Sequence, residues 1–384
     1  MKFLLFNFAF SCCDAIFGKT ILRHRFNIAP NNALPGKLKS NRQEVKARGG
    51  QLHVYATIAH QQWGKIRMDL LRRRILAAGS AAGLAFALPS AFGRAPLAGN
   101  QGISIHRMKL GEFEVTTMLD GYLDIPPVLL QGDPELVKQL LANAGLPGAP
   151  IRLPVNTFLV NTGAKLVMID TGGAKMLGPT AGRLPQCLAQ AGIEAGQIDE
   201  VYITHMHGDH LHGAVTPEGA RMFPNATVRV AKPDLDYWGS AEVEGKAPAD
   251  QRGRFAAAKR AIAAYGDRLV TFTLGDELTP GIRSVPAAGH TPGHSCYMVQ
   301  SGAARLLLLG DAIHVAPVQF PRPEITIGFD WDQPAARAAR LKMFEMAAKE
   351  NMLIGAVHVA FPGIGRLRAT GTGFAFDPLP WQLF

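Results

Sequence analysis

Residues 205–210 read HMHGDH and follow the short apolar run VYI at residues 201–203, with Thr204 between them. Three imidazoles and one carboxylate within six positions are a higher density of metal-binding side chains than an ordinary turn contains. A His-x-His pair on an extended turn places both imidazoles on the same side of the backbone. The spacing therefore predicts that His205 and His207 bind one metal ion together, whereas the alternative interpretation is a His-rich surface loop.

The last two residues of this stretch are adjacent and therefore point in different directions. Asp209 and His210 can reach a second ion beside the first. Imidazole and carboxylate groups favour zinc or another borderline divalent cation, and they disfavour metals that prefer thiolates. The stretch thus predicts two divalent cations, with Zn²⁺ as the expected ion.

Residues 289–294, GHTPGH, offer two further imidazoles. Pro292 and Gly293 force a turn at this point, so only one of the two imidazoles is expected to face the ions. We choose His290, because it closes the strand side of the loop. His294 is then expected to support a ligand or to lie in the core.

Two later strand ends carry the remaining candidate ligands. Asp311 follows the apolar run 305–309 and is well placed to bridge two ions, and His358 follows the apolar run 353–357. Taken singly, a turn aspartate and a core histidine explain these residues equally well. The combination of several strand ends that each carry His or Asp favours a metal site.

Apolar and β-branched runs separated by helical segments predict two sheets that lie between helices. Residues 154–162 and 165–170 predict a hairpin that ends at Asp170, and the Ala-rich residues 333–349 predict an amphipathic helix of the core or of a subunit contact. Further strands are expected at residues 112–118, 199–204, 227–231, 269–273, 282–286, 295–300, 305–309 and, as the last strand, 353–357; further helices are expected at residues 180–196 and 254–265.

The charge of the chain is concentrated in its N-terminal quarter. The formal net charge is +10, but residues 1–93 hold 14 of the 40 Lys and Arg residues and 3 of the 30 Asp and Glu residues. The remaining 26 basic and 27 acidic residues leave the body nearly neutral. Because phosphate binding needs a concentrated basic surface, we expect no nucleic-acid partner.

Residues 68–93 resemble an export signal of the twin-arginine type, with three consecutive arginines at 72–74 before an apolar Ala/Leu/Gly stretch. A membrane span needs about 20 predominantly apolar residues, so we expect no stable membrane insertion after signal removal. An uncleaved anchor or a buried helix is the alternative. We expect residues 1–67 to be a mis-called or disordered extension, residues 94–384 to form the folded domain that carries these motifs, and the protein to be periplasmic or secreted.

The motifs together resemble the metallo-β-lactamase superfamily from about residue 103 to the C-terminus, and Asp170 matches its first motif. Three segments resemble the methyl parathion hydrolase branch, near dihydrocoumarin and acyl-homoserine lactone hydrolases. They are AGHTPGHS at 288–295, QFPRPE at 319–324 and HVAFPGIG at 358–365. One departure is His212, where the superfamily usually has glycine; we expect this to affect loop packing rather than chemistry.

The resemblance implies an α+β fold, the αββα four-layer sandwich, with two metal ions. By motif position, His205, His207 and His290 would hold one ion; Asp209, His210 and His358 would hold the other; Asp311 would bridge them. Water between two cations would be held as hydroxide, because metal binding lowers its pKa to about 7. The hydroxide would attack a carbonyl carbon or phosphorus, while one ion stabilises the developing charge. Asp209 or water would supply the leaving-group proton.

The resulting hypothesis is a dinuclear metal-dependent hydrolase that cleaves an uncharged lactone, aryl ester or organophosphate triester. Trp238, Phe255 and Phe361 are expected to line the substrate pocket, with ordinary core packing as the alternative. A β-lactamase or a thioester hydrolase like glyoxalase II is the second enzyme hypothesis. A non-catalytic metal-binding or nucleic-acid-binding module is the hypothesis from another class. The sequence leaves a homodimer open.

Overall fold

The computed structural model describes residues 97–146, 148 and 150–381. The predictions for residues 1–67 and 68–93 lie outside the described residues. Among the helices of the described part, none is long and apolar enough to cross a membrane. The described residues belong to one compact unit that begins at Leu97.

Within the described residues, the strands of the first sheet run in the order β1-β2-β4-β5-β6-β7-β8. The hairpin of β4 and β5 pairs antiparallel, as the sequence predicted, and β5 to β8 then run parallel. The strands are β1 Ile105–Leu110, β2 Phe113–Ile125, β4 Ile151–Asn161, β5 Leu166–Ile169, β6 Glu200–Tyr202, β7 Thr227–Ala231 and β8 Leu269–Phe272.

The second sheet, within the same described part, runs in the order β16-β15-β14-β12-β11-β10-β9. Its central strands β12 and β14 are parallel, and β3 and β13 form a separate small ladder. The strands are β9 Glu277–Thr279, β10 Ile282–Pro286, β11 Ser295–Ser301, β12 Ala304–Leu308, β14 Leu353–Gly355, β15 Ile364–Ala369 and β16 Phe374–Pro378, with β3 Leu130–Gln131 and β13 Thr326–Ile327 in the ladder.

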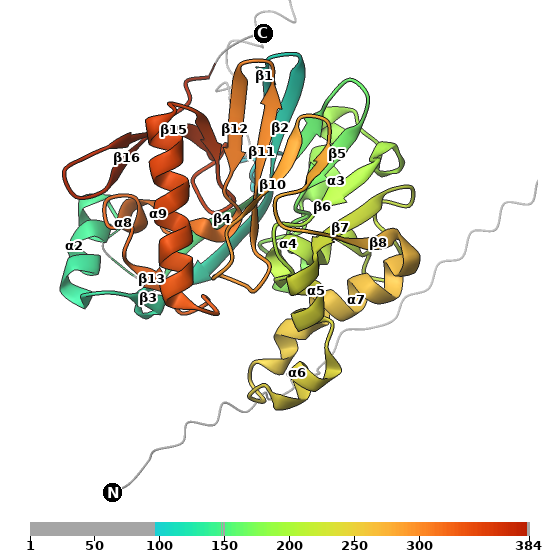
Figure 1. Ribbon diagram of the computed structural model, residues 1–384, viewed down its shortest axis with the longest axis horizontal. Coiled ribbons are helices and arrows are strands. Elements are labelled where there is room, and N and C mark those ends of the chain that lie inside the picture. The colour runs from blue at the N-terminus through green and yellow to red at the C-terminus, as the bar shows by residue number, and fades with distance from the viewer. Residues whose placement is uncertain (1–96, 147, 149, 382–384) are drawn as a thin grey trace, which may run out of the picture. The chain divides into compact units, whose positions relative to one another are not determined.

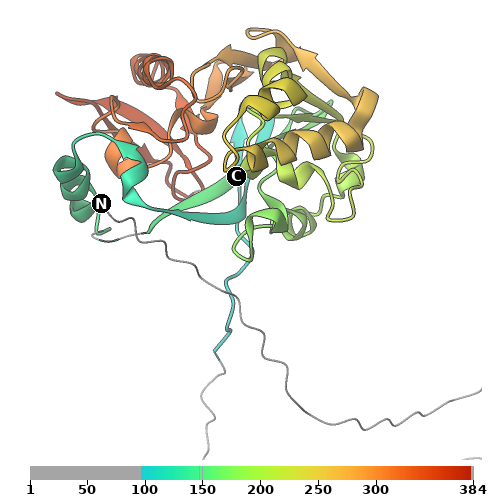
Figure 2. The ribbon, with the colours of Figure 1, turned by 90° about the horizontal axis from the view of Figure 1, so that it is seen from below.

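Helices cover the outer face of each sheet (Figures 1 and 2), which confirms the α+β fold with αββα layers. The α-helices are α2 Pro134–Asn143, α3 Leu184–Ala191, α4 Gly208–Leu211, α5 Lys232–Trp238, α6 Ala241–Lys246, α7 Ala256–Tyr265, α8 Ala316–Gln319 and α9 Gln333–Lys349. The 3-10 helices are η1 Pro127–Leu129, η2 Ala174–Leu177, η3 Ala195–Gln197, η4 His212–Ala214, η5 Arg252–Phe255, η6 Gly266–Arg268 and η7 Gly310–Ala312.

The hydrophobic core has one layer between the sheets and one under each set of helices. Phe158, Tyr297 and Leu306 belong to the central layer. Met168 and Val228 face α3 and α7, and residues of the second sheet face α9. Burial on both faces explains why the parallel strands β5 and β14 are continuous apolar runs rather than alternating ones.

Several predicted elements match the structure to the residue, namely β7, β10 and α9. Helix α9 begins where the side chain of Asp332 accepts a hydrogen bond from the Ala335 amide, with Pro334 in the first turn. Helix α3 is shorter than the predicted span 180–196. It starts with Pro185 in its first turn and ends at Gly192, whose φ of 74° is left-handed.

Other predictions were incomplete. Strand β14 is not the last strand, because β15 and β16 follow it as an antiparallel hairpin. Their segment is rich in glycine and arginine and therefore does not stand out as apolar. Helix α2 was also missed, although Asp133 caps it by accepting the Glu135 amide.

Candidate metal centre

The candidate ligands lie where strands of both sheets end. In parallel pairs, carboxyl ends meet at one edge, and both β5·β6 and β12·β14 are such pairs. Strand β6 leads into the HMHGDH turn and α4, β12 leads to Asp311, and β14 leads to His358. The connection between β10 and β11 carries His290. Strand direction therefore gathers residues that are far apart in the sequence.

Four residues form a first group whose ligand atoms all lie within 4.8 Å of one another: His205, His207, His290 and Asp311. The Nε2 atoms of His205 and His290 each lie 3.0 Å from Nδ1 of His207. Asp311 Oδ2 lies 3.2 Å from His290 Nε2 and 3.5 Å from His205 Nε2. Three imidazoles and one carboxylate oxygen thus converge on one point.

Asp209, His210, His358 and Asp311 form the second group, within the same 4.8 Å limit. Asp311 contributes its other oxygen, Oδ1, which lies 3.1 Å from His210 Nε2 and 3.2 Å from His358 Nε2. Asp209 Oδ2 lies 3.3 Å from His358 Nε2. The structure therefore brings together all seven predicted residues, and Asp311 is the one that belongs to both groups.

Hydrogen bonds outside the two groups orient the imidazoles of the second group. His358 Nδ1 lies 2.8 Å from the Pro154 carbonyl oxygen, which can only accept, so Nδ1 carries the proton. His210 Nδ1 lies 2.8 Å from Asp170 Oδ2 and donates in the same way. Each arrangement leaves the Nε2 lone pair directed at the group, as metal-binding histidines require. Asp170 thus supports a candidate ligand and is not itself one.

The choice between His290 and His294 is explained by their partners. His290 donates from Nδ1 to Asp330 Oδ1 at 2.8 Å and keeps Nε2 in the first group. His294 is buried, and its Nδ1 donates to the Ala287 carbonyl at 3.0 Å. Its Nε2 accepts the backbone N–H of Asp311 at 3.0 Å. His294 therefore positions the shared carboxylate from outside both groups.

The electrostatics of the site favour added positive charge. Two atoms at its centre, His210 Nε2 and Asp311 Oδ1, are buried and make no hydrogen bond to the described residues. Although burial lowers the pKa of His358, the carboxylates of Asp311 and Asp209 raise it to about 10. Burial also lowers the pKa of His290, but the carboxylates of Asp311 and Asp330 outweigh this effect and raise the pKa to about 9. The donor set of imidazoles and carboxylates, with orphaned lone pairs, fits divalent cations.

A cavity of about 360 Å³ opens over the two groups. Its apolar wall comes from Leu123, Leu153, Leu177 and Phe329. The polar lining consists of His207, Gly208, Asp209, His212, Asp250, Gly253, Arg254, His290, Asp311, His314 and His358. The segment before α7 therefore overhangs the site, as expected, but through Asp250 and Arg254 rather than through its aromatic residues.

The three aromatic residues expected in the pocket do not line this cavity. Trp238 and Phe255 are 5% and 2% exposed and pack in the core layer beneath α7. The Trp238 and His207 ring centres lie 5.1 Å apart, with the ring planes at 71° to each other. Phe361 is half-buried in the loop after His358 and is also absent from the lining. Large aromatic side chains are more stable when buried than when exposed in a wet cleft, and this explains why Trp238 and Phe255 lie in the core rather than in the cavity wall.

His314 was not predicted from the sequence as a site residue, and His212 was expected only to affect the packing of its loop. His314 is buried against the cavity, with Nε2 3.1 Å from Asp311 Oδ2, and neither ring nitrogen makes a hydrogen bond to the described residues. Its position three residues after Asp311 was the available signal. His212 lines the cavity with a mostly buried ring.

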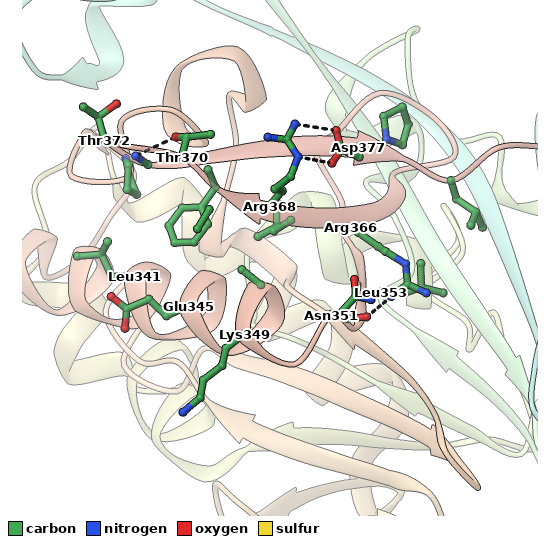
Figure 3. A pocket seen from close by; sticks show the side chains of 18 of the residues that line it. Leu341, Glu345, Lys349, Asn351, Leu353, Arg366, Arg368, Thr370, Thr372 and Asp377 are labelled. Atoms are coloured by element: carbon green, nitrogen blue, oxygen red, sulfur yellow. Dashed lines mark hydrogen bonds and ion pairs between the residues drawn. The ribbon is translucent and has the colours of Figure 1, made fainter.

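A larger cavity, about 1020 Å³, lies between α9 and the hairpin of β15 and β16 (Figure 3). Leu341, Arg366 and Arg368 are among its lining residues, and Arg368 pairs with Asp377 across the hairpin. None of the seven candidate ligands is among the described residues that line it. The larger of these two cavities is therefore not the one that contains the candidate metal ligands.

Comparison with known proteins gives a consistent family relationship. The family model described as the metallo-beta-lactamase superfamily matches residues 150–354. The crystal structure of the hydrolase AbOPH, in the beta lactamase superfamily, is similar, with 32% identity and a TM-score of 0.70 over 74% of this chain and 100% of that one. The dizinc quorum-quenching lactonase AidC, solved in complex with a product, is 26% identical with a TM-score of 0.69 over 73% of this chain and 99% of that one.

Sequence relatives with curated names match a smaller share of the chain. An atrochrysone carboxyl ACP thioesterase of Paecilomyces divaricatus is 29% identical over 194 residues, 49% of this chain and 48% of the relative. A second protein of that name, from Aspergillus novofumigatus, is 30% identical over 129 residues, 33% of this chain and 36% of the relative. The chain thus spans half or less of the length of these relatives.

Proposed function

Because the chain belongs to the metallo-β-lactamase superfamily, we propose that it is a dinuclear metal-dependent hydrolase of uncharged lactones, aryl esters or phosphotriesters. One observation carries the proposal: two groups of four ligand atoms share Asp311, with one carboxylate oxygen in each group. Binding sites for two metal ions that share a carboxylate are suited to displacement reactions at carbonyl or phosphoryl centres.

The residues of the first group would hold one divalent cation and those of the second group the other, with Zn²⁺ as the ion expected from the ligands. When bound, two such cations supply Lewis acidity and lower the pKa of a water held between them to about 7. Asp311 acts by fixing the two cation positions relative to each other. The hydrogen bonds of Asp170, Asp330 and Pro154 hold the imidazoles in the required tautomers.

The cleft also supplies groups for the leaving-group proton. Asp209 lines the cavity and turns Oδ2 toward the second group, so its other oxygen, Oδ1, can take up a proton from water and pass it to the leaving group. His314 lies beside Asp311 with both ring nitrogens free of other described partners, so its N–H can donate to a substrate oxygen. We propose Asp209 or water as the proton donor of the reaction, and His314 as a neutral hydrogen-bond donor to the substrate.

The lining of the cavity supports an uncharged substrate. Leu123, Leu153, Leu177 and Phe329 provide apolar area, and the charged residues outside the ligand groups, Asp250 and Arg254, are one of each sign. A ligand without net charge would lose little hydration energy in such a cleft. This lining disfavours an anionic glutathione thioester.

The proposal is tested with the full chain loaded with a measured amount of zinc. Initial rates are compared on dihydrocoumarin, a homoserine lactone, methyl parathion, nitrocefin and a glutathione thioester. We expect at least one of the first three to give a kcat/KM at least about tenfold higher than nitrocefin and the thioester, which corresponds to about 1.4 kcal/mol of transition-state binding. A preference for nitrocefin would instead indicate a β-lactamase.

A second candidate function is thioester hydrolysis, which the similarity to the two thioesterases favours. A rate on the glutathione thioester above the rates on the lactones and esters of the same panel would support this second activity. A non-catalytic metal-binding module remains as the alternative from another class, and His207→Ala tests it. We expect this variant to lose at least about 100-fold in kcat/KM, because a ligand of the first group is removed. Undiminished hydrolysis by His207→Ala would remove the catalytic assignment of the site.

A further inference from the structure

Asp234 is a carboxylate of α5 that is buried completely and lies outside both ligand groups. Its Oδ2 accepts the backbone N–H of Met206 at 2.9 Å. Its Oδ1 accepts the backbone N–H of Gly293 at 2.6 Å. One carboxylate thus ties together two loops that are separated by almost ninety positions in the sequence.

Both loops carry imidazoles of the first group. Met206 lies between His205 and His207, so the hydrogen bond from its amide to Asp234 holds the HMHGDH turn in place. Gly293 closes the turn that begins near His290. All three imidazoles of the first group therefore belong to loops whose backbone is held by the same side chain.

The contact with Gly293 is closely fitted. A Cβ atom at this position would lie 2.5 Å from the Asp234 backbone nitrogen and 3.0 Å from Oδ1. A glycine is therefore needed for the turn to approach α5. The same helix reaches the site again at its end, where the Trp238 ring packs edge-on against His207. Helix α5 is thus in contact with both parts of the first group.

A carboxylate in the first turn of a helix is ordinarily explained by its interaction with the amides of that helix. Asp234 instead accepts hydrogen bonds from amides of two other loops. Burial of a carboxylate is costly unless it is hydrogen-bonded, so both bonds are needed to keep it there. The geometry therefore suggests a role in the site rather than in the start of α5.

We propose that Asp234 is a positioning residue that fixes the distance between the HMHGDH turn and the GHTPGH turn, and so the geometry of the first metal ion. This inference rests on the proposed metal centre. Its consequence is selective: the second group takes none of its ligands from the GHTPGH turn, and its His358 is held by the Pro154 carbonyl. Loss of the Asp234 carboxylate should therefore weaken the first ion more than the second.

The test compares Asp234→Ala and Asp234→Asn with the wild type in the full chain. Asp236→Asn is the matched control, because Asp236 lies on the same helix but is exposed and pairs with Lys232. Metal content is measured after dialysis. The affinity of each protein for the first and the second ion is measured by competition with a chromophoric chelator. Cobalt-loaded protein gives the absorption spectrum of the ligand field. The melting temperature of the metal-free proteins is recorded alongside.

We expect the wild type and Asp236→Asn to bind two ions. Asp234→Ala should bind the first ion about 10- to 100-fold more weakly, with a changed cobalt spectrum, and the second ion nearly as tightly as the wild type. Asp234→Asn keeps the shape and one acceptor oxygen, so it should fall between them, and it provides the test if Asp234→Ala does not fold.

Two results would overturn the inference while leaving the proposed function intact. One is wild-type affinity for both ions in both variants. The other is an equal loss of both ions that follows the fall in the melting temperature of the metal-free protein, as a purely structural role requires. Failure of the wild type itself to bind metal would instead overturn the proposed function.

Discussion

At the scale of single residues, two neighbours fix the position of Asp311: Gly310, which has no side chain, and His294, which accepts a hydrogen bond from the Asp311 amide. Gly310 has a left-handed φ of 52°, and a Cβ atom there would lie 2.7 Å from His294 Nε2. That nitrogen accepts the Asp311 amide. The pair of Gly310 and His294 therefore holds the shared carboxylate without taking part in either ligand group.

His314 gives the prediction that belongs to this scale. Burial lowers the pKa of His314, so the ring is neutral and can donate an N–H in the cleft. We expect His314→Ala to lower kcat by about 100-fold, in the range of a lost hydrogen-bond donor to a developing oxyanion, while both ions stay bound. Steady-state kinetics and metal analysis on the same preparation check this.

His314→Gln serves as the comparison, because its amide keeps an N–H donor of similar reach. We expect it to recover part of the lost kcat. A wild-type kcat in His314→Ala, or a loss of metal that accounts for the whole loss of rate, would contradict the proposed role.

At the scale of secondary-structure elements, helix α9 does more than the core or contact role that its composition predicted. Arg340 in its middle is fully buried. Its guanidinium donates to the carbonyl oxygens of Ala312, Pro323 and Ile325. It also lies 3.7 Å from Asp330, the partner of His290. The helix thus holds the segment after Asp311 and, through Asp330, one imidazole of the first group.

We predict that Arg340→Met destabilises the fold by about 3 kcal/mol, because the carbonyl groups and the buried Asp330 lose their partner. Urea unfolding at neutral pH measures this. Arg337→Met on the exposed side of the same helix is the control and should change stability by less than about 0.5 kcal/mol. An equal effect of the two substitutions would show that helix composition, rather than the buried network, determines the loss.

At the scale of the whole molecule, the candidate ligands come from both sheets. His205, His207, Asp209 and His210 follow β6 of the first sheet, whereas Asp311 and His358 follow strands of the second. Metal ions bound there would connect the two halves of the sandwich. Binding to the native state alone would also stabilise it by mass action.

Removal of metal with a chelator should therefore lower the melting temperature of the full chain by several degrees, since about 3 kcal/mol is expected at a free metal concentration of about 100 Kd. Scanning calorimetry before chelation, after chelation and after addition of zinc measures the change. No change in melting temperature after complete metal removal, confirmed by elemental analysis, would contradict a linking role.

The pH dependence of the metal-free fold should depend on Glu200, at the start of β6. Its carboxylate is buried, which alone would raise its pKa, but Arg229 and Lys165 lower the pKa below the usual value of 4.5. The folded value is thus below the unfolded one. The stabilisation is present above about pH 4.5 and is lost as the pH falls through the folded pKa.

Glu200→Gln tests this. We expect the free energy of unfolding of the metal-free variant to be lower than that of the wild type at neutral pH, with the difference shrinking as the solution is acidified below about pH 4. Denaturant titrations across this range measure it. A difference that does not depend on pH would show that the side chain acts through packing instead.

Much of the fold could be predicted because apolar residues recur with the period of a strand or of a helix. β7, β10 and α9 were predicted to the residue for that reason. β15 and β16 were not, because Arg366 and Arg368 interrupt their apolar pattern and pairing with β14 decides their structure. The seven candidate ligands were predictable, since His and Asp follow apolar runs. The pocket aromatics were not, because an aromatic side chain in a helix has no signal that separates core from cleft.

The sequence by itself determined which residues meet at the candidate metal centre, because strand direction and turn chemistry are local properties that place strand ends at one edge of a sheet. Only the tertiary structure decided how the residues of HMHGDH are held. Asp234, His294 and Arg340 act through hydrogen bonds to distant backbone groups, and such contacts depend on how layers pack rather than on any spacing in the chain. The tertiary structure also decided that Leu123, Phe329 and His314 face the cleft, because burial on the cleft side follows from the packing of whole elements.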